Sequence, residues 1–122
     1  AALATVRADG RPHVAPVWFT LDADDVIFTT WHDSVKGKNL RRSGQVAVMV
    51  DDAAPPYAFV TIEGEADISE DLSALRYWAM RIAARYMGSA MAETYGARNG
   101  VPGELLIRVR PMTRIGKWGV AE

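Results

Sequence analysis

A short cationic segment, residues 34–42, is the part of the sequence best suited to chemistry. It carries four cations and no acidic residue, and threonines come shortly before it. The pattern predicts a strand that ends near residue 31 and a helix over about Val35–Arg42. A helix start offers unpaired backbone N–H groups and a partial positive charge, a combination that holds phosphate groups in proteins. Side chains that would add Coulomb attraction or directional hydrogen bonds are Thr30, Lys36, Lys38 and Asn39.

The same segment also fits a plainer interpretation, a solvated cationic face that begins a helix. The residues alone leave the phosphate site and the solvated face both open. Arg41 and Arg42 fit the surface interpretation better, so we do not assign them to a ligand.

Tryptophan supplies the second candidate feature, an apolar wall. A planar ring such as a flavin needs such a wall and little water, and Trp18 and Trp31 are suited to provide it. For each of them taken alone, packing in a core or an interface is the simpler interpretation. Trp118 lies near the chain end, where a partner contact or a lid over a ligand is plausible. His32 could donate a proton, although it and His13 read more simply as surface residues.

The composition excludes several classes of protein. The chain has 122 residues with 14 Lys+Arg and 15 Asp+Glu, and this net charge of −1 argues against a bulk nucleic-acid binder. Cysteine is absent and histidine occurs twice, so we expect no disulfide framework and no metal site. No GxSxG, HExxH, Walker or GxGxxG motif is present. The length fits one domain, 1–122, with a thin core.

Short strands separated by turn signals position these candidates, and they favour a mainly β fold with one or two helices. Six or seven strands around so few helices predict a small β-barrel, which also removes exposed strand edges. An amphipathic helix over about 70–87 and a shorter one over Ser89–Tyr95 follow the strands of the first two-thirds. The predicted strands are Leu3–Arg7, His13–Leu21, Val26–Trp31, Gln45–Val50, Tyr57–Ile68, Glu104–Arg110 and Met112–Trp118.

Individual residues predict how these elements begin, end and bend. Gly10 follows an aspartate, a strong signal for a hairpin, and Pro16 suggests an interruption or an edge strand. Gly64 invites a bulge, and Pro111 is expected to break the last two strands apart. Ser69 is the expected cap of the long helix. Asp33 or Ser34 is expected to cap the short one, and Gly88 to end the long one.

No stretch is apolar enough to span a membrane, and no secretory signal is visible. A cytoplasmic protein is therefore expected. The chain begins without Met and already inside an apolar run, so we expect a preceding segment to be missing.

Several motifs occur together in the order known from one family. The opening Leu3–Phe19, the run Lys36-Gly37-Lys38-Asn39-Leu40-Arg41-Arg42, and the segments Val46–Asp52 and Tyr57–Ala66 resemble the pyridoxamine 5′-phosphate oxidase-like split β-barrel family. Each motif is short, but their order and spacing make the resemblance fairly specific over Leu3–Ile68. The resemblance implies a split β-barrel and a homodimer with two cofactor sites at the subunit interface. A dimer of that kind would also explain why both faces of His13–Leu21 are apolar.

Within that family the sequence looks most similar to actinobacterial flavin/deazaflavin oxidoreductases, especially the branch that uses coenzyme F-420, an 8-hydroxy-5-deazaflavin. The Pro-Pro-Tyr loop and the Met-Gly-Ser-Ala-Met-Ala-Glu segment look like that branch. The implied activity is hydride transfer between the reduced deazaflavin and an activated double bond of a small organic substrate. The cofactor does the difficult chemistry, and the protein positions it and excludes water.

The resemblance also implies roles for individual residues. Thr29 and Thr30 fall on the strand bordering the cofactor ring, and Trp18 on a strand flanking it. Ser34 stands where relatives often carry a cation, so it would retain at most a hydroxyl bond to phosphate. Trp118 would reach the site of the other subunit. The phosphate-binding positions of the family coincide with Lys36, Lys38 and Asn39.

Two alternatives use the same fold. The chain could bind FMN as an oxidoreductase, or it could be a non-enzymatic protein that binds haem or another large planar ligand, as its tryptophan-rich and histidine-poor pattern allows. No catalytic residue is assigned; solvent or His32 could supply a proton.

Overall fold

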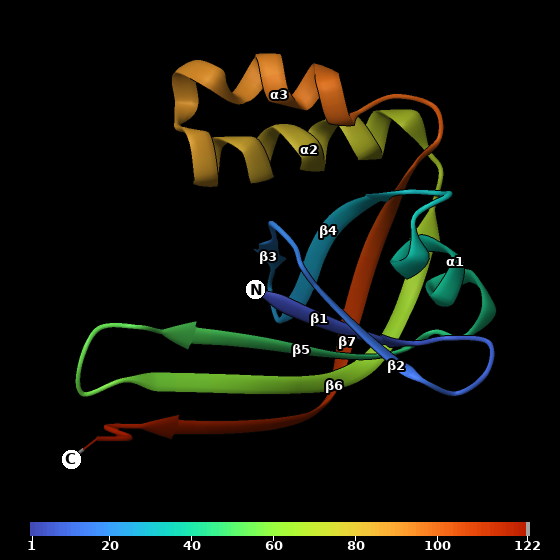
Figure 1. Ribbon diagram of the computed structural model, residues 1–122. Coiled ribbons are helices and arrows are strands. Elements are labelled where there is room, and N and C mark those ends of the chain that lie inside the picture. The colour runs from blue at the N-terminus through green and yellow to red at the C-terminus, as the bar shows by residue number, and fades with distance from the viewer. Residues whose placement is uncertain (122) are drawn as a thin grey trace.

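The computed structural model describes residues 1–121 as one seven-stranded antiparallel sheet with three α-helices and one 3₁₀ turn (Figure 1). The order of strands across the sheet is β2-β1-β5-β6-β7-β4-β3. The strands are β1 (Ala2–Val6), β2 (Pro12–Pro16), β3 (Thr20–Asp22), β4 (Asp25–Trp31), β5 (Gln45–Asp52), β6 (Ala58–Ser69) and β7 (Glu104–Trp118). The helices are α1 (Val35–Arg42), α2 (Leu72–Met87), η1 (Ser89–Met91) and α3 (Ala92–Asn99).

The sheet curls without closing, which confirms the predicted split barrel. Its two edge strands, β2 and β3, follow each other in the chain and are joined by Val17–Phe19 rather than by a strand ladder. Backbone hydrogen bonds between Ala1 and Val17, with N···O distances of 3.2 and 2.9 Å, hold this connection against the start of β1. β2 is therefore an edge strand, where Pro16 costs no ladder hydrogen bond.

The interior of the curled sheet holds the main apolar core. Alternate residues of β4 and β7 point into it, as the period of two in a strand requires. α1 adds Leu40 from one end. The buried members are Leu3, Val17, Phe19, Val26, Phe28, Leu40, Val46, Val48, Ile62, Leu105, Ile107 and Val109.

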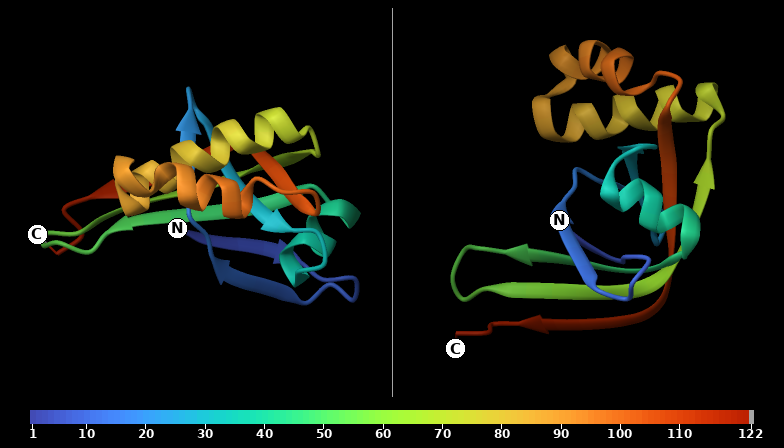
Figure 2. Two further views of the ribbon diagram at one scale, coloured as in Figure 1. Left: turned by 90° about the horizontal axis from the view of Figure 1, so that it is seen from above. Right: turned by 45° about the vertical axis from the view of Figure 1, so that its right-hand side comes forward.

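Helix α2 packs across the outer face of the same two strands, and α3 lies against α2 (Figure 2). A smaller apolar cluster forms there from Ile27, Leu75 and Leu106, with Leu72 and Trp78 at its margin. β4 and the first half of β7 are thus covered on both sides, whereas the far part of the sheet is not.

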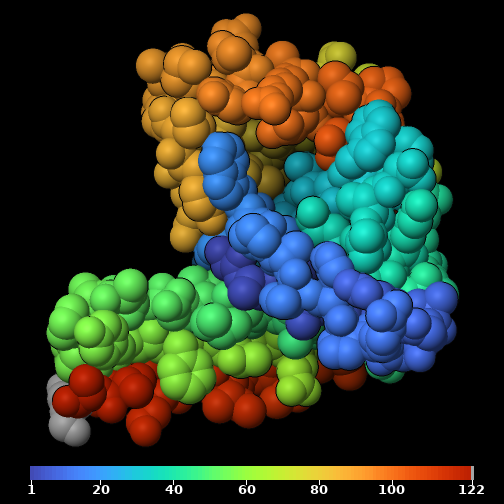
Figure 3. Space-filling model, viewed as in Figure 1, coloured from blue at the N-terminus to red at the C-terminus, as the bar shows by residue number. Residues whose placement is uncertain are grey.

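That far part is an arm of three paired strands, residues 49–61 with residues 115–118. β6 and β7 bend midway, and the arm runs from the bend away from the helices to the C-terminal end (Figure 1). The space-filling view shows an open notch between the arm and the helical layer (Figure 3).

Several local predictions are confirmed. Gly10, with φ of 90°, lies in the turn between β1 and β2, and Gly88, with φ of 84°, ends α2. Ser34 caps α1 by accepting a hydrogen bond from the Gly37 N–H. The register of β6 against β7 shifts between Glu63 and Gly64, as the glycine suggested.

Three predictions are wrong in detail. His13–Leu21 is not one strand, because the chain leaves the ladder at Val17–Phe19 to cross the open side of the barrel. Pro111 does not split the last strand: β7 runs unbroken from Glu104 to Trp118, because the shift opposite Gly64 leaves one extra β7 residue there and places the proline at an irregular point of the ladder.

The third concerns the start of α2. Its cap is Asp71, which accepts from the Ser73 N–H, while Ser69 is the last residue of β6 and accepts from the Asp71 N–H. None of the helices in residues 1–121 is long and apolar enough to cross a bilayer.

Candidate functional site

Strand β4 ends beside a cavity of about 270 Å³, which several elements line. The end of β4, the first turn of α1 and the start of β7 supply one side, and α2 and α3 supply the other. We refer to it as the Lys36 cavity. Its lining residues are Trp18, Thr29, Thr30, Trp31, Ser34, Lys36, Ile82, Asn99 and Glu104.

Five of the eight residues predicted for a cofactor site lie together in this cavity. They come from three separate segments: the connection between β2 and β3, strand β4, and the beginning of α1. The structure therefore brings together Trp18, Thr29, Thr30, Ser34 and Lys36. Trp31, the other tryptophan singled out in the sequence, lines it as well.

The hydroxyl groups at the helix start are already occupied by internal hydrogen bonds. Ser34 Oγ donates to the Trp31 carbonyl at 2.8 Å and accepts from the Gly37 N–H at 3.0 Å. Because that serine has a single proton, Thr30 Oγ1 is the donor of the 2.9 Å bond between the two hydroxyls. Thr30 and Ser34 thus fix the turn between β4 and α1, and Gly37 is required there, since a Cβ would lie 2.5 Å from the Trp31 carbonyl oxygen.

Lys36 is the cation that faces the cavity. Lys38 instead lies on the surface with its ammonium 3.3 Å from the Asp33 carboxylate. Asn39 is only 4% exposed, and its amide group donates to Thr5 Oγ1 at 3.0 Å and accepts from Arg42 at 2.8 Å. Neither Lys38 nor Asn39 lines the Lys36 cavity.

An aromatic stack supports the Trp18 wall of the cavity. The rings of Trp18 and Tyr86 lie 4.9 Å apart and nearly parallel. The Tyr86 hydroxyl also accepts a hydrogen bond from the Phe19 N–H at 3.2 Å, which ties α2 to the connection between β2 and β3. Sequence reasoning treated Tyr86 as ordinary helix packing, and nothing in its spacing distinguished it.

Trp31 closes the cavity on another side by packing over Gly103. A Cβ on that glycine would lie 2.5 Å from the tryptophan ring, and its φ of 99° also favours glycine. His32 follows, with its backbone N–H and its Nδ1 each 2.9 Å from the Gly103 carbonyl oxygen. These contacts hold His32, in the turn after β4, against the loop that precedes β7, and it does not line the cavity.

Glu104 is the lining residue that sequence reasoning missed. It is the first residue of β7 and pairs with Trp31 across the ladder, so the two side chains share the face that the helices cover. Burial raises the pKa of its carboxyl above the ordinary value, while the charges of Lys36 and His32 act in the opposite direction. A lone glutamate at a strand start carried no signal in the sequence.

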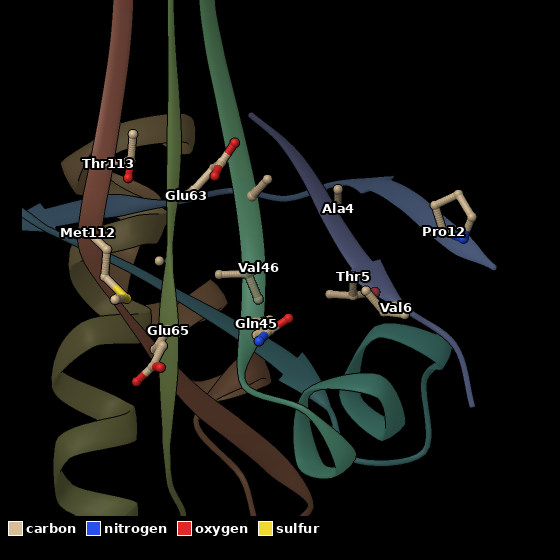
Figure 4. Close-up of a pocket in the computed structure, with 12 residues that line it drawn as sticks. Ala4, Thr5, Val6, Pro12, Gln45, Val46, Glu63, Glu65, Met112 and Thr113 are labelled. Atoms are coloured by element: carbon tan, nitrogen blue, oxygen red, sulfur yellow. The ribbon is translucent and has the colours of Figure 1, made fainter. Parts of the chain in front are cut away.

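Trp118 lies elsewhere, on the arm, where it is 84% exposed. The sheet itself carries a second, broader hollow of about 430 Å³, which we call the sheet groove (Figure 4). Side chains of β1, β5, β6 and β7 line it, including Val6, Glu63, Glu65 and Met112. No predicted cofactor residue lines the sheet groove. No group of three potential metal-ligating side chains occurs within residues 1–121.

Comparison with known sequences gives one family. The sequence model described as "Pyridoxamine 5'-phosphate oxidase" matches residues 1–116. A curated relative, the F-420H(2)-dependent biliverdin reductase of Mycobacterium tuberculosis, is 38% identical over 88 residues, which is 70% of this chain. The match spans 62% of that relative's own length.

Comparison with solved structures agrees. A conserved hypothetical protein from Mycobacterium tuberculosis superposes with a TM-score of 0.84 at 24% identity, over 97% of this chain and 76% of that one. A structure named as an F-420 reductase superposes with a TM-score of 0.74 at 29% identity, over 93% of this chain and 86% of that one. The first similarity shows the fold alone. The second is a similarity to a structure named as an F-420 reductase.

Proposed function

The chain belongs to the pyridoxamine 5′-phosphate oxidase family, and from this premise we propose that it is an F-420-dependent oxidoreductase. Its reaction is hydride transfer between the reduced deazaflavin and an activated double bond of a small organic substrate. The relatives support this: one is named as an F-420H(2)-dependent biliverdin reductase and another as an F-420 reductase. Only the class of reaction is carried over from those names.

The observation that carries the proposal is the Lys36 cavity. It combines one cation at a helix start, two tryptophan rings and a threonine hydroxyl in one hollow between sheet and helices. Such a set of side chains fits a ligand with an anionic end and a planar apolar part. In coenzyme F-420 the phosphate is such an anionic end and the deazaflavin ring is such a planar part. The residues of the cavity therefore fit this cofactor.

When bound, the deazaflavin supplies hydride at its C5 position. The chain's own residues bind and orient it. Lys36 attracts the phosphate, together with the backbone N–H groups of Val35 and Lys36 in the first turn of α1, whereas the Gly37 N–H is already bonded to Ser34 Oγ. Trp18 and Thr29 border the ring, and the α2 and α3 side chains Ile82 and Asn99 cover that side of the cavity and exclude water.

The internal hydrogen bonds assign Thr30 and Ser34 to a supporting role in this proposal. Their hydroxyl protons are used within the turn, so they hold Lys36 in place rather than bind the phosphate. Asn39 likewise fixes α1 against β1 through Thr5. Lys38 is exposed and paired with Asp33, so it would reach a phosphate only by leaving that surface pair.

We further propose a homodimer in which the arm and the sheet groove meet a second copy. Large apolar side chains are exposed along this part of the sheet, on the side away from α2 and α3, and Trp118 at the end of β7 would then contact the partner's cofactor site. The exposed residues are Val14, Met49, Met112, Ile115 and Trp118. Light scattering should give twice the chain mass of 13.4 kDa, and a monomer at micromolar concentration would contradict the dimer.

Titration with F-420 beside FMN tests the cofactor. We expect quenching of tryptophan fluorescence by F-420 at lower concentration than by FMN, because Trp18 and Trp31 line the cavity. Tighter binding of FMN, or protein that is yellow from purification, would support the FMN oxidoreductase instead. Retained affinity for haem without any redox turnover would support a binding protein and contradict the enzyme.

A further inference from the structure

Glu104 places a carboxyl group in a cavity that otherwise suits an anion. It lines the Lys36 cavity together with Lys36, and it also lines a smaller hollow of about 150 Å³ beside Leu72 and Leu75 of the α2 start. The next residue on the same face of β7 is Leu106, which is buried in the α2 cluster. The carboxyl group therefore lies at the margin of an apolar cluster rather than in open solvent.

The other carboxylates nearby are paired, and Glu104 is not. Asp33 pairs with Lys38 at 3.3 Å, and Glu70 pairs with Arg41 at 3.0 Å. Among residues 1–121, no side chain forms a hydrogen bond or an ion pair with the Glu104 carboxyl. Its charge is thus free to act on whatever enters the cavity.

The charged groups around Glu104 come from every element that packs near it. Lys36 faces it from α1 and His32 from the end of β4, and Glu70, which also lines the smaller hollow, comes from the segment before α2. Asn99 of α3 is neutral. Burial raises the pKa of Glu104, and the electrostatic effects of Lys36 and His32 oppose this rise without cancelling it.

An anion that enters the cavity meets opposing charges on its walls. While Glu104 is ionised it offsets the field of Lys36 and repels the anion, and once protonated it can donate a hydrogen bond instead. We infer that Glu104 is a specificity-determining residue that couples the binding of an anionic group in the Lys36 cavity to the uptake of a proton. This inference rests on the proposed function insofar as the anion is the cofactor phosphate.

The sign of the coupling follows from the charges. A bound anion favours the protonated form, so it raises the pKa of Glu104 further and protons are taken up between the free and the bound pKa. Affinity should therefore fall as pH rises through that window, which begins above the ordinary value of 4.5. Glu104→Gln keeps the shape of the side chain and removes its charge. This variant should therefore bind the anion more tightly at the upper end of the pH window and lose this part of the pH dependence.

Titrations of the whole chain from pH 5 to pH 8.5 at constant ionic strength test the inference. The probes are F-420 and sulfate, an anion whose own charge does not change over this range. Binding is followed by tryptophan fluorescence, and by calorimetry in two buffers of different ionisation enthalpy, which counts the protons taken up. Near pH 8 we expect Glu104→Gln to bind each probe on the order of fivefold more tightly than the unchanged chain, and this difference should shrink as the pH is lowered to 5.

Glu70→Gln is the matched control, because it removes a neighbouring carboxylate that lines only the smaller hollow. It should leave the pH profile of the unchanged chain intact. Equal pH profiles for Glu104→Gln and the unchanged chain, or a loss of affinity in Glu104→Gln at every pH, would overturn the inference.

The two probes separate the inference from the proposed function. Sulfate binding with the expected profile but no F-420 binding would support the first and contradict the second. If F-420 binds and Glu104→Gln leaves the pH profile of its binding unchanged, the proposed function is supported and the inference about Glu104 is contradicted. If neither probe binds, both are wrong.

Discussion

Strands β4 and β7 present two faces that are built from alternate residues of the same two segments. The face toward the barrel interior is apolar and buried where β4 pairs with β7, through residues such as Val26, Phe28 and Ile107, until it ends at the buried Thr30. The face toward the helices starts in the same way, with Ile27 against Leu106, and then changes to polar side chains where it meets the Lys36 cavity. One pair of strands therefore supplies stability on one side and a candidate binding site on the other.

This difference predicts that substitutions one residue apart have unlike effects. A substitution on the interior face should lower the free energy of unfolding. Any loss of ligand affinity should then be a consequence of that lower stability. A change at the cavity end of the other face should alter affinity at nearly constant stability. The four predictions below test this separation in order of decreasing effect.

Phe28→Ala should cause the largest loss. The side chain is fully buried, and its removal leaves a cavity in the interior core, which typically costs about 3–5 kcal/mol. Urea denaturation followed by far-ultraviolet circular dichroism measures the change. Thr29→Ala, on the other face of the same strand, is the comparison and should cost far less. A loss below about 1 kcal/mol for Phe28→Ala would mean that the interior face is not the main source of stability.

Lys36→Ala should weaken F-420 binding by about 1–3 kcal/mol, or roughly 5- to 150-fold, because a charge-assisted contact to phosphate is lost. Its stability should stay nearly unchanged, since no ion pair joins Lys36 to the rest of residues 1–121. Lys38→Ala provides a control with the same charge change two residues along and should have a smaller effect. Equal losses in the two variants would contradict the assignment of Lys36 to the cavity.

Ser34→Ala should cost about 1 kcal/mol of unfolding free energy, the usual value of a helix N-cap. The variant removes the acceptor for the Gly37 N–H and leaves Thr30 without its hydroxyl partner. F-420 affinity should fall less than in Lys36→Ala, because the serine proton is directed to the Trp31 carbonyl. A larger loss of affinity than of stability would show that this hydroxyl binds the ligand after all.

Glu104→Gln should have the smallest effect on stability, and one that depends on pH. The folded state binds the Glu104 proton more tightly than the unfolded state does, because burial raises the pKa of the carboxyl above 4.5. The contribution of the protonated group is therefore present in full below pH 4.5 and is lost as pH rises through the folded-state pKa. The free energy of unfolding of the unchanged chain minus that of the variant should therefore be smaller at pH 8 than at pH 4. An identical difference at both pH values would contradict this.

Much of this fold follows from local patterns in the sequence. Short apolar runs between turn signals predicted β4, β5 and most of β6, and Ser34 and Gly88 correctly marked a helix start and a helix end. The errors occur where distant partners decide the outcome. Pro111 reads as a strand breaker, yet the register shift opposite Gly64 lets β7 continue past it.

The candidate site was predictable to the extent that its residues are neighbours in the sequence. Lys36 and the threonines before it belong to one short segment, and the tryptophans stand out by type. Tyr86 and Glu104 lie 50 or more residues away from that segment, and only the packing of α2 and the pairing of β4 with β7 bring them in. Neither packing across such distances nor the burial of one carboxyl group can be deduced from residue types alone.

β7 is the last strand along the chain, yet it lies near the middle of the sheet, between β6 and β4. On the ribosome, the paired strands β3 and β4 would therefore have no hydrogen-bonded link to the rest of the sheet until β7 has been made. The earlier part can pair β1, β2, β5 and β6, but the surface that α2 covers does not exist until residues 104–109 arrive. Because these contacts join residues about 80 positions apart, folding should be slow and cooperative, and the Lys36 cavity should appear in its final step.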